Sequence, residues 1–292
     1  MQQVKVVTDS SVGLPDALIE EYGIRFAPLQ IIFGDKTYRD RIELSPADFY
    51  SMLEGSDKLP TTSAPTSQDF LAIYKEAANE AKNIVCLCLT QRFSTMGIKS
   101  ALQAKEEARE FLPDVRIEVF DSRSAVGGMG LIVLAAAQAA QEGKTLPEVI
   151  ATAESVRDRI NVIEVMDTLK YLAKGGRIGK AAHWAGSLLN IKPILEVSNL
   201  TGAVEPVERI RTKQKALERL LEIVSERVKG QGPLHAIVDH SNTPVEAERL
   251  KEQVIANFDC YEIYISDITP ACGVHLGPRV VGVSFYAEDK HT

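Results

Sequence analysis

Short apolar runs alternate with stretches of helical periodicity through the first half of the chain. Four of these runs are bounded by turn residues and predict strands at residues 4–10, 25–34, 83–90 and 116–122. The run 84–89 (Ile-Val-Cys-Leu-Cys-Leu) is apolar at every position, which is typical of a strand covered on both faces. Such strands in alternation with helices predict a three-layer α/β domain built on a parallel sheet.

Helix starts in the same half have a clear signal. Ser45, Thr66 and Thr145 are each followed three residues later by an acid, which is the spacing of a capping box. A further helix is predicted at 99–112. Residues 124–141 contain no charged side chain and reach the length of a short membrane span, but their glycine, alanine and glutamine content favours a buried helix.

The second half has a different pattern, in which strands follow one another more directly. The turn 199–202 joins two apolar runs and predicts a hairpin. Strands are predicted at 162–166, 193–198, 203–207, 234–239, 260–266 and 279–286, with helices at 212–229 and 244–258. We therefore predict two domains, an N-terminal three-layer parallel-sheet α/β domain (1–160) and a C-terminal α+β domain (161–292) with a more antiparallel sheet.

Charge is unevenly distributed along the 292 residues. The net charge is −7, which argues against a general nucleic-acid binder. Residues 1–160 account for −6 of it, whereas residues 168–195 contain five cations and no acid. Residues 209–215 form a second basic stretch, Arg209, Arg211, Lys213 and Lys215. Such stretches are often solvated faces, but two of them in an acidic protein also fit an anionic ligand or partner.

Several familiar chemistries are excluded or disfavoured. Residues 175–180 resemble a phosphate-binding loop, but only three residues separate the outer glycines and Ala181 stands where a Ser or Thr is needed. Neighbours in the run Asp239-His240-Ser241 point to alternate faces of a strand and cannot form a relay. No metal-ligand pattern is present, and we expect no metal site. The four cysteines form no CxxC pair and the first residues show no secretory signal, so we expect reduced thiols and a cytoplasmic location.

Three short segments are candidates for a binding site. The segment 60–66 is rich in hydroxyls and precedes a helix start, which suits a carboxylate or phosphate, although an ordinary capped loop has the same composition. The segment 92–97 follows a buried strand, where ligands bind in open α/β sheets. His275 precedes a Gly-Pro turn that would fix its position, either as a structural or as a functional residue.

In this order, these features resemble the DegV family of bacterial lipid-binding proteins. The most specific stretches are 168–180 (Thr-Leu-Lys-Tyr-Leu-Ala-Lys-Gly-Gly-Arg-Ile-Gly-Lys) and 186–195 (Gly-Ser-Leu-Leu-Asn-Ile-Lys-Pro-Ile-Leu). Supporting matches are Thr8-Asp9-Ser10, Phe120-Asp121-Ser122 and the Thr62-Ser63-x-Pro segment. The resemblance spans nearly the whole chain.

The resemblance implies a non-enzymatic subunit of a bacterial fatty acid kinase. One long-chain fatty acid, such as palmitate, would lie between the domains, with no cofactor. A separate ATP-binding kinase subunit would convert its carboxylate to an acyl-phosphate for phospholipid synthesis. We expect no membrane span and at most transient membrane contact. The matching positions imply a carboxylate site and a kinase-facing residue: Thr62, Ser63, Thr95, Arg177 and His275 for the first, Arg211 for the second.

The chain departs from the family pattern around this site. The departures are Gln91 and Arg92 in place of two serines, Ala64 in place of a common Gln, Met96 in the second hydroxyl loop, and Arg279 in place of a Gly. Arg92 would add a cation near the carboxylate. Two other functions stay open: an enzyme that acts alone on a small anionic substrate with His275 as acid or base, and a regulatory protein for which the lipid is a signal.

Overall fold

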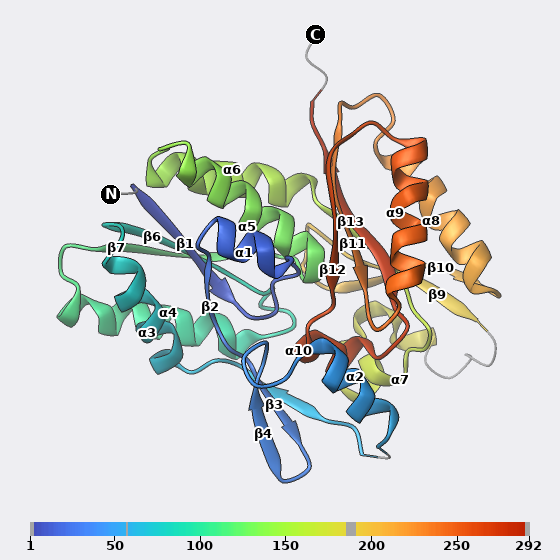
Figure 1. Cartoon of the computed structure of the whole chain (residues 1–292), viewed down its shortest axis with the longest axis horizontal. Coiled ribbons are helices and arrows are strands. Elements are labelled where there is room, and N and C mark those ends of the chain that lie inside the picture. The colour runs from blue at the N-terminus through green and yellow to red at the C-terminus, as the bar shows by residue number, and fades with distance from the viewer. Residues whose placement is uncertain (1–2, 57, 185–190, 290–292) are drawn as a thin grey trace.

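The N-terminal half forms the predicted parallel sheet. The computed structural model describes residues 3–56, 58–184 and 191–289. Four strands pair in the order β2-β1-β6-β7, all parallel: β1 (Val4–Asp9), β2 (Arg25–Ala27), β6 (Asn83–Cys88) and β7 (Arg116–Asp121). Helices α3 (Ser67–Ala78) and α4 (Thr95–Phe111) cover one face, while α5 (Val126–Gln141) and α6 (Leu146–Arg159) cover the other (Figure 1).

The central strand β6 shows why its sequence is apolar at every position. Cys86 and Cys88 pack with α3 and α4, whereas Val85 and Leu87 pack with α5 and α6. Both faces are thus buried, as the pattern predicts, and both cysteines are buried free thiols. The capping boxes at Thr66 and Thr145 are also confirmed at the starts of α3 and α6.

The C-terminal half forms a mixed six-stranded sheet. Its order is β10-β9-β8-β13-β11-β12, with β11 and β12 parallel and every other pair antiparallel. The strands are β8 (Asn161–Val165), β9 (Lys192–Val197), β10 (Val204–Ile210), β11 (Leu234–His240), β12 (Cys260–Asp267) and β13 (Val281–Ala287). The predicted hairpin is formed by β9 and β10. Helices α8 (Lys213–Arg227) and α9 (Pro244–Asn257) cover the outer face (Figure 1).

Helix α5 lies between the two sheets. It contacts β1 of the parallel sheet and also β8, β11 and β13 of the mixed sheet. All of its residues from Val126 to Ala137 are buried, which explains a helix that is apolar on every side. The buried helix predicted from this charge-free stretch is confirmed, and no helix in the described part of the chain is long and apolar enough to cross a membrane.

A small antiparallel sheet below the two large ones differs from the prediction. It has the order β4-β3-β5 and consists of β3 (Gln30–Phe33), β4 (Lys36–Arg39) and β5 (Thr61–Ser63). The single strand predicted at 25–34 is wrong, because β2 and β3 belong to different sheets. Pro28, which has no N–H to donate to a ladder, lies at the break. The hydroxyl-rich segment predicted as a loop contains strand β5.

Short helices complete the region around this small sheet. Helix α10 (Pro270–Leu276) contacts α2 (Pro46–Glu54), α7 (Lys170–Lys174), β3 and β5. The other short elements are α1 (Asp16–Glu21) and a 3₁₀ helix, Gly179–Trp184. Neither α7 nor α10 was predicted. The final strand begins at Val281 rather than at 279, because Arg279 has a positive φ of 63° that no strand residue adopts.

Candidate functional site

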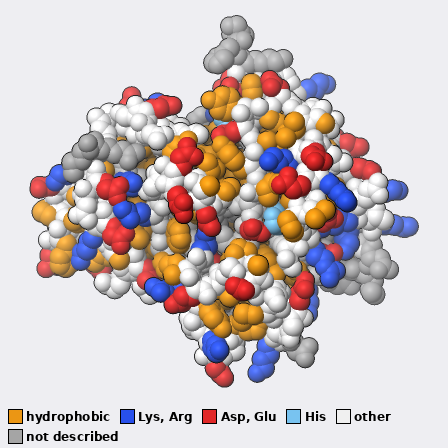
Figure 2. Space-filling model, in the orientation of Figure 1, with side chains coloured by type: hydrophobic (Ala, Val, Ile, Leu, Met, Phe, Trp, Pro, Cys, Tyr) orange, Lys and Arg blue, Asp and Glu red, His pale blue; other side chains and the backbone are white. Residues whose placement is uncertain are grey.

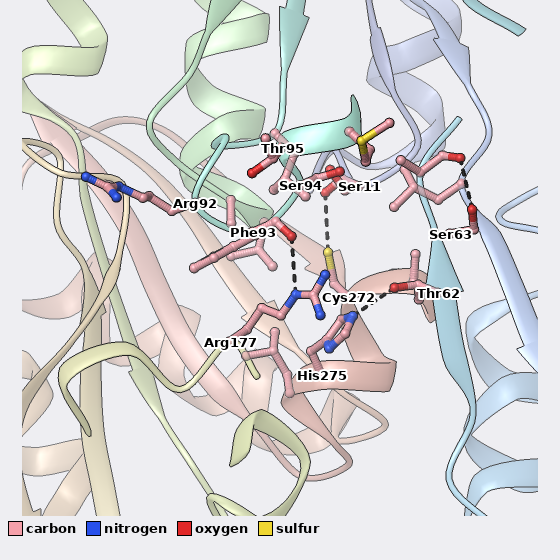
Figure 3. A pocket seen from close by; sticks show the side chains of 18 of the residues that line it. Ser11, Thr62, Ser63, Arg92, Phe93, Ser94, Thr95, Arg177, Cys272 and His275 are labelled. Carbon is pink, nitrogen blue, oxygen red and sulfur yellow. Dashed lines mark hydrogen bonds between the residues drawn. The ribbon is translucent and has the colours of Figure 1, made fainter. Parts of the chain in front are cut away.

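A cavity of about 730 Å³ opens where the two large sheets and the small sheet meet. Its size falls within the usual range for small-molecule sites. The polar part of its wall comes from β5, from the segment before α4, from the turn after α7 and from α10 (Figure 3). The rest is mostly apolar, including Leu29, Leu89, Val162, Leu172, Val197, Val204 and Leu276. The cavity therefore has a polar region and an apolar wall.

The polar region is organised by a contact between Thr62 and His275. Oγ1 of Thr62, on β5, lies 2.9 Å from Nε2 of His275, on α10. Burial, together with the positive charge of Arg177, lowers the pKa of His275 to about 4. The imidazole is therefore neutral near pH 7 and is a poor general acid there.

The other ring nitrogen of His275 is packed against a glycine. Nδ1 is buried without a hydrogen-bond partner in the described part of the chain, and a Cβ on Gly175 would lie 2.3 Å from it. The Gly-Pro turn expected to fix this histidine is present after α10. Gly277 has a φ of 78° and leaves no room for a side chain beside Tyr171. His275 is thus held from both sides.

Arg177 supplies positive charge to the same wall. Its Nε donates to the carbonyl of Phe93 at 3.2 Å and its Nη1 to the carbonyl of Gly175 at 2.5 Å. Within the described residues it forms no ion pair with an acid. Gly176, with a φ of 69°, makes the turn that places Arg177 after α7. An arginine held by two carbonyls and not neutralised by an acid is suited to an anionic ligand.

The remaining cations of the basic stretch 168–195 do not share this position. Lys180 pairs with Glu205, Lys192 pairs with Asp167, and Lys170 lies over the ring of Tyr171. Lys170, Lys174 and Lys180 are exposed and Lys192 is half-buried, which fits the solvated face, the more ordinary of the two interpretations. Residues 186–190 of the second family stretch lie outside the described residues. Over the face shown in Figure 2, acidic and basic side chains are interspersed.

Ser63 and Thr95 line the cavity but their hydroxyls are turned elsewhere. The Ser63 hydroxyl donates to the Ala64 carbonyl at 3.4 Å, and the Thr95 hydroxyl donates to the Gln91 carbonyl at 3.0 Å. In Figure 3 both hydroxyls lie apart from the Arg177 and His275 side chains. The structure therefore brings together three of the five predicted carboxylate-site residues: Thr62, Arg177 and His275.

The nearby helix terminus is already occupied. The side chain of Asp69 accepts hydrogen bonds from the backbone N–H and the hydroxyl of Thr66, both at 2.7 Å. Because this carboxylate occupies the N-terminus of α3, the terminus does not add to the positive charge of the cavity. The positive charge that suits the cavity to an anion therefore comes from Arg177.

The residues that depart from the family pattern lie partly at the cavity and partly away from it. Arg92 donates through Nε to the carbonyl of Thr201 at 3.3 Å, and its guanidinium points away from His275 (Figure 3). Arg92 also lines the cavity, so the expected extra cation near the carboxylate stays a prediction. Met96 and Ala64 line the cavity, and Met96 is exposed. The carbonyl of Arg279 accepts a hydrogen bond from Lys213 at 2.5 Å.

Arg211 lies outside the cavity. It is exposed between β10 and α8, and no described acid pairs with it. Lys213, two residues later, pairs with Glu246. Arg211 is thus an accessible cation, as a partner-facing residue must be.

Sequence analysis does not identify the acidic residue of the cavity. Glu164 on β8 lines the apolar wall and is only 4% exposed. The signal was a single acid in the otherwise apolar run of the predicted strand 162–166. Elsewhere in the described ranges, no group of three or more His, Cys, Asp or Glu side chains could hold a metal ion.

Comparisons with known proteins agree over the whole chain. The family model described as "Uncharacterised protein, DegV family" matches residues 3–288. A DegV domain-containing protein of Clostridium perfringens is 34% identical over 285 residues, which are 98% of this chain and 99% of that protein. Protein DegV of Bacillus subtilis is 31% identical over 281 residues, covering 96% and 98% of the two chains.

Solved structures of DegV proteins also resemble this chain over nearly its whole length. A DegV family protein from Thermus thermophilus, whose structure is described by its fatty acid binding, superposes with a TM-score of 0.89 at 31% identity, covering 98% and 99% of the two chains. DegV from Bacillus subtilis, described as a fatty acid binding protein, has a TM-score of 0.87 at 30% identity, covering 99% and 100%. These matches cover nearly the whole of both chains, including both large sheets. The chain belongs to the DegV family.

Proposed function

We propose that this protein binds one long-chain fatty acid, with the carboxylate at Thr62, Arg177 and His275. The observation that carries this proposal is the Arg177 guanidinium, which has no acidic partner among the described residues and lies at the polar region of an apolar cavity. The fatty acid binding of the Thermus and Bacillus proteins supports it. Ser63 and Thr95 would join the head-group site by rotating their hydroxyls toward the ligand.

The energetics of such a ligand are reasonable. Burying a palmitoyl chain removes about fourteen methylenes from water, at roughly 0.8 kcal/mol each, or about 11 kcal/mol in total. Association entropy offsets much of this gain, yet submicromolar affinity is within reach. A carboxylate buried without partners would cancel it, so a cation and hydroxyl donors are required.

The first test is direct. Protein purified from the expression host is denatured, extracted and analysed by mass spectrometry for fatty acid at near-equimolar amounts. The delipidated protein is then titrated with palmitate. Protein that is free of lipid and does not bind added palmitate would rule out the proposal.

The same proposal includes a larger assembly. The fatty acid would be presented to a separate ATP-binding kinase subunit that phosphorylates its carboxylate for phospholipid synthesis, with Arg211 at the contact. This part is supported by the exposed position of Arg211 outside the cavity, where no acid of the described residues pairs with it. The protein would act in the cytoplasm, where its four free cysteines stay reduced, with at most transient membrane contact.

Two domains, 1–160 and 161–292, would enclose the ligand. Thr62 comes from the first and Arg177 and His275 come from the second, so the site needs both. The four-stranded parallel sheet lies wholly before residue 160 and the mixed sheet wholly after it. This distribution supports the boundary.

The kinase role is tested with Arg211→Ala and the control Arg249→Ala, an exposed arginine on α9. We expect Arg211→Ala to retain palmitate affinity but to lose acyl-phosphate formation with the kinase subunit and ATP, while the control retains both. Equal loss of both activities would place Arg211 in the lipid site instead. Turnover of a small anionic substrate by the isolated protein would favour a stand-alone enzyme, and lipid binding without any phosphorylation would favour a regulatory protein.

A further inference from the structure

The apolar wall of the cavity contains one acidic side chain, Glu164. It lies on the same face of β8 as Val162, and Leu172, Val197 and Val204 line the same cavity. Glu164 is 4% exposed, and neither of its carboxyl oxygens has a hydrogen-bond partner within residues 3–56, 58–184 and 191–289. A buried carboxyl without partners costs free energy, so its presence in a lipid cavity calls for a physical reason.

The backbone around Glu164 is shaped to accommodate the carboxyl. Gly282 of β13 pairs with Glu164, and a Cβ on Gly282 would lie 2.2 Å from Oε2. Any larger residue at 282 would displace the acid. The carboxyl therefore occupies space that the neighbouring strand leaves open.

A second acid in the same row shows what a structural carboxyl looks like here. Asp239 on β11 pairs with the other side of Gly282. Its Oδ1 accepts from the backbone N–H of Gly127 at 2.9 Å and its Oδ2 from the hydroxyl of Ser284 at 2.8 Å. Asp239 thus anchors the start of α5 to the sheet, whereas Glu164 holds no described group in place and lines the cavity.

The charge state of Glu164 fits an apolar cavity. Burial raises the pKa of Glu164 well above its ordinary value, and the nearby Asp239 carboxyl raises it further. A pKa raised in this way favours the uncharged acid, which has one O–H donor and a carbonyl acceptor. A hydroxyl group is the complementary partner, because it accepts one hydrogen bond and donates another. A plain methylene chain would leave both of these groups unsatisfied.

We propose that Glu164 is a subsite for a hydroxyl group on the acyl chain, so that the ligands of this protein include hydroxy fatty acids. This inference rests on the proposed function, since the carboxylate must first be fixed at Arg177 for a distant hydroxyl to reach Glu164. Because Glu164 is on a central strand of a rigid sheet, only one region of the chain can meet it. The preference must therefore depend on the position of the hydroxyl.

The test compares stearate with 3-hydroxystearate, 10-hydroxystearate and 12-hydroxystearate, together with further positional isomers, on the delipidated wild-type protein. Each ligand is also titrated against Glu164→Leu, which removes the polar group, and Glu164→Gln, which keeps a donor and an acceptor. For each protein, the affinity of every hydroxystearate is divided by that of stearate. We expect this ratio to be about tenfold higher in wild type than in Glu164→Leu for one isomer. Glu164→Gln should retain part of that preference, and stearate should bind Glu164→Leu at least as tightly as wild type.

The outcomes distinguish a failure of the Glu164 subsite from a failure of fatty acid binding itself. Stearate binding with no hydroxy preference at any position, or a preference unchanged in Glu164→Leu, would overturn the subsite and leave fatty acid binding intact. Failure of every ligand to bind wild type would overturn the fatty acid site and the subsite together. Thermal melting of both variants verifies folding, and the Gln variant preserves the test if the Leu variant is unstable.

Discussion

Oγ1 of Thr62 lies 2.9 Å from Nε2 of His275, although 213 residues separate the two in sequence. Nδ1 of the same ring has no described partner and faces Gly175. A bare lone pair at Nδ1 is easier to bury than an unpaired N–H, so we assign the proton to Nε2, where it donates to Thr62. The hydroxyl proton of Thr62 then stays available for a ligand carboxylate.

This arrangement makes Thr62 a direct donor to the head group. Thr62→Val keeps the shape and removes the hydroxyl, and we expect about tenfold weaker palmitate binding, as for one lost hydrogen bond to a charged acceptor. Thr62→Ser should stay close to wild type in the same titration. Ser63→Ala serves as the neighbouring control, and a loss in Ser63→Ala as large as in Thr62→Val would assign the head group to Ser63 instead.

Arg177 should matter more than any other cation in its segment. Arg177→Met leaves the carboxylate without charge compensation inside an apolar cavity, so we expect palmitate affinity to fall by about a hundredfold. Lys180→Met removes the same charge three residues away, from a side chain paired with Glu205 on the surface. Isothermal titration at two salt concentrations measures the palmitate affinity of both variants. Equal losses of affinity would show that the ligand responds only to the overall positive charge of the basic stretch.

Gly175 and Gly176 form a matched pair for testing the position of His275. Gly175 has an ordinary backbone conformation with a φ of −77°, but a Cβ there would meet Nδ1 of His275 at 2.3 Å. Gly176→Ala would meet no atom within 4 Å and would suffer only the strain of its φ of 69°. We expect Gly175→Ala to lower palmitate affinity about tenfold and Gly176→Ala to lower mainly the melting temperature. Unchanged palmitate affinity in Gly175→Ala, with a loss of affinity in Gly176→Ala, would show that His275 is free to move.

The sequence predicts the large sheets well, because their strands have long apolar signals. The strand expected at 83–90 is found at Asn83–Cys88, and the Thr66 capping box starts α3 where expected. The region below these sheets is predicted poorly. Helices α7 and α10 have five and seven residues, too few for a helical period to be read.

The sequence suggests candidate site residues one at a time but does not show how they are arranged. Motif resemblance identifies Thr62, Arg177 and His275 individually, but their proximity depends on contacts among β5, α7 and α10 that no local pattern encodes. Hydroxyl orientation is also not encoded in a motif, and the Ser63 and Thr95 hydroxyls donate to nearby carbonyls. The direction of the Arg92 side chain is not encoded locally either, because a turn residue distant in sequence, Thr201, accepts its hydrogen bond.

Asp40 should make the stability of the protein depend on pH. It is fully buried, accepting hydrogen bonds from the Ser10 hydroxyl at 2.6 Å and from the Ala271 N–H, at the start of α10, at 3.2 Å. Burial raises the pKa of Asp40 from 3.8 to about 7. Between these two values the folded state keeps a proton that the unfolded chain releases. The free energy of unfolding therefore falls as pH rises through this window, by a few kcal/mol at most, on the order of 1.4 per unit.

Asp40→Asn removes the titrating group and keeps a donor and an acceptor in the same place. We expect the free energy of unfolding of the variant, minus that of wild type, to increase from pH 5 to pH 8. The reason is that only the wild type must ionise a buried carboxyl over that range. Urea unfolding at several pH values measures the difference, and Asp35→Asn, an exposed acid between β3 and β4, controls for the change in net charge. A difference between Asp40→Asn and wild type that stays constant from pH 5 to pH 8 would mean that Asp40 does not titrate in this window. Because Asp40 also anchors α10, which contains His275, palmitate affinity measured across the same range would show whether this ionisation reaches the head-group site.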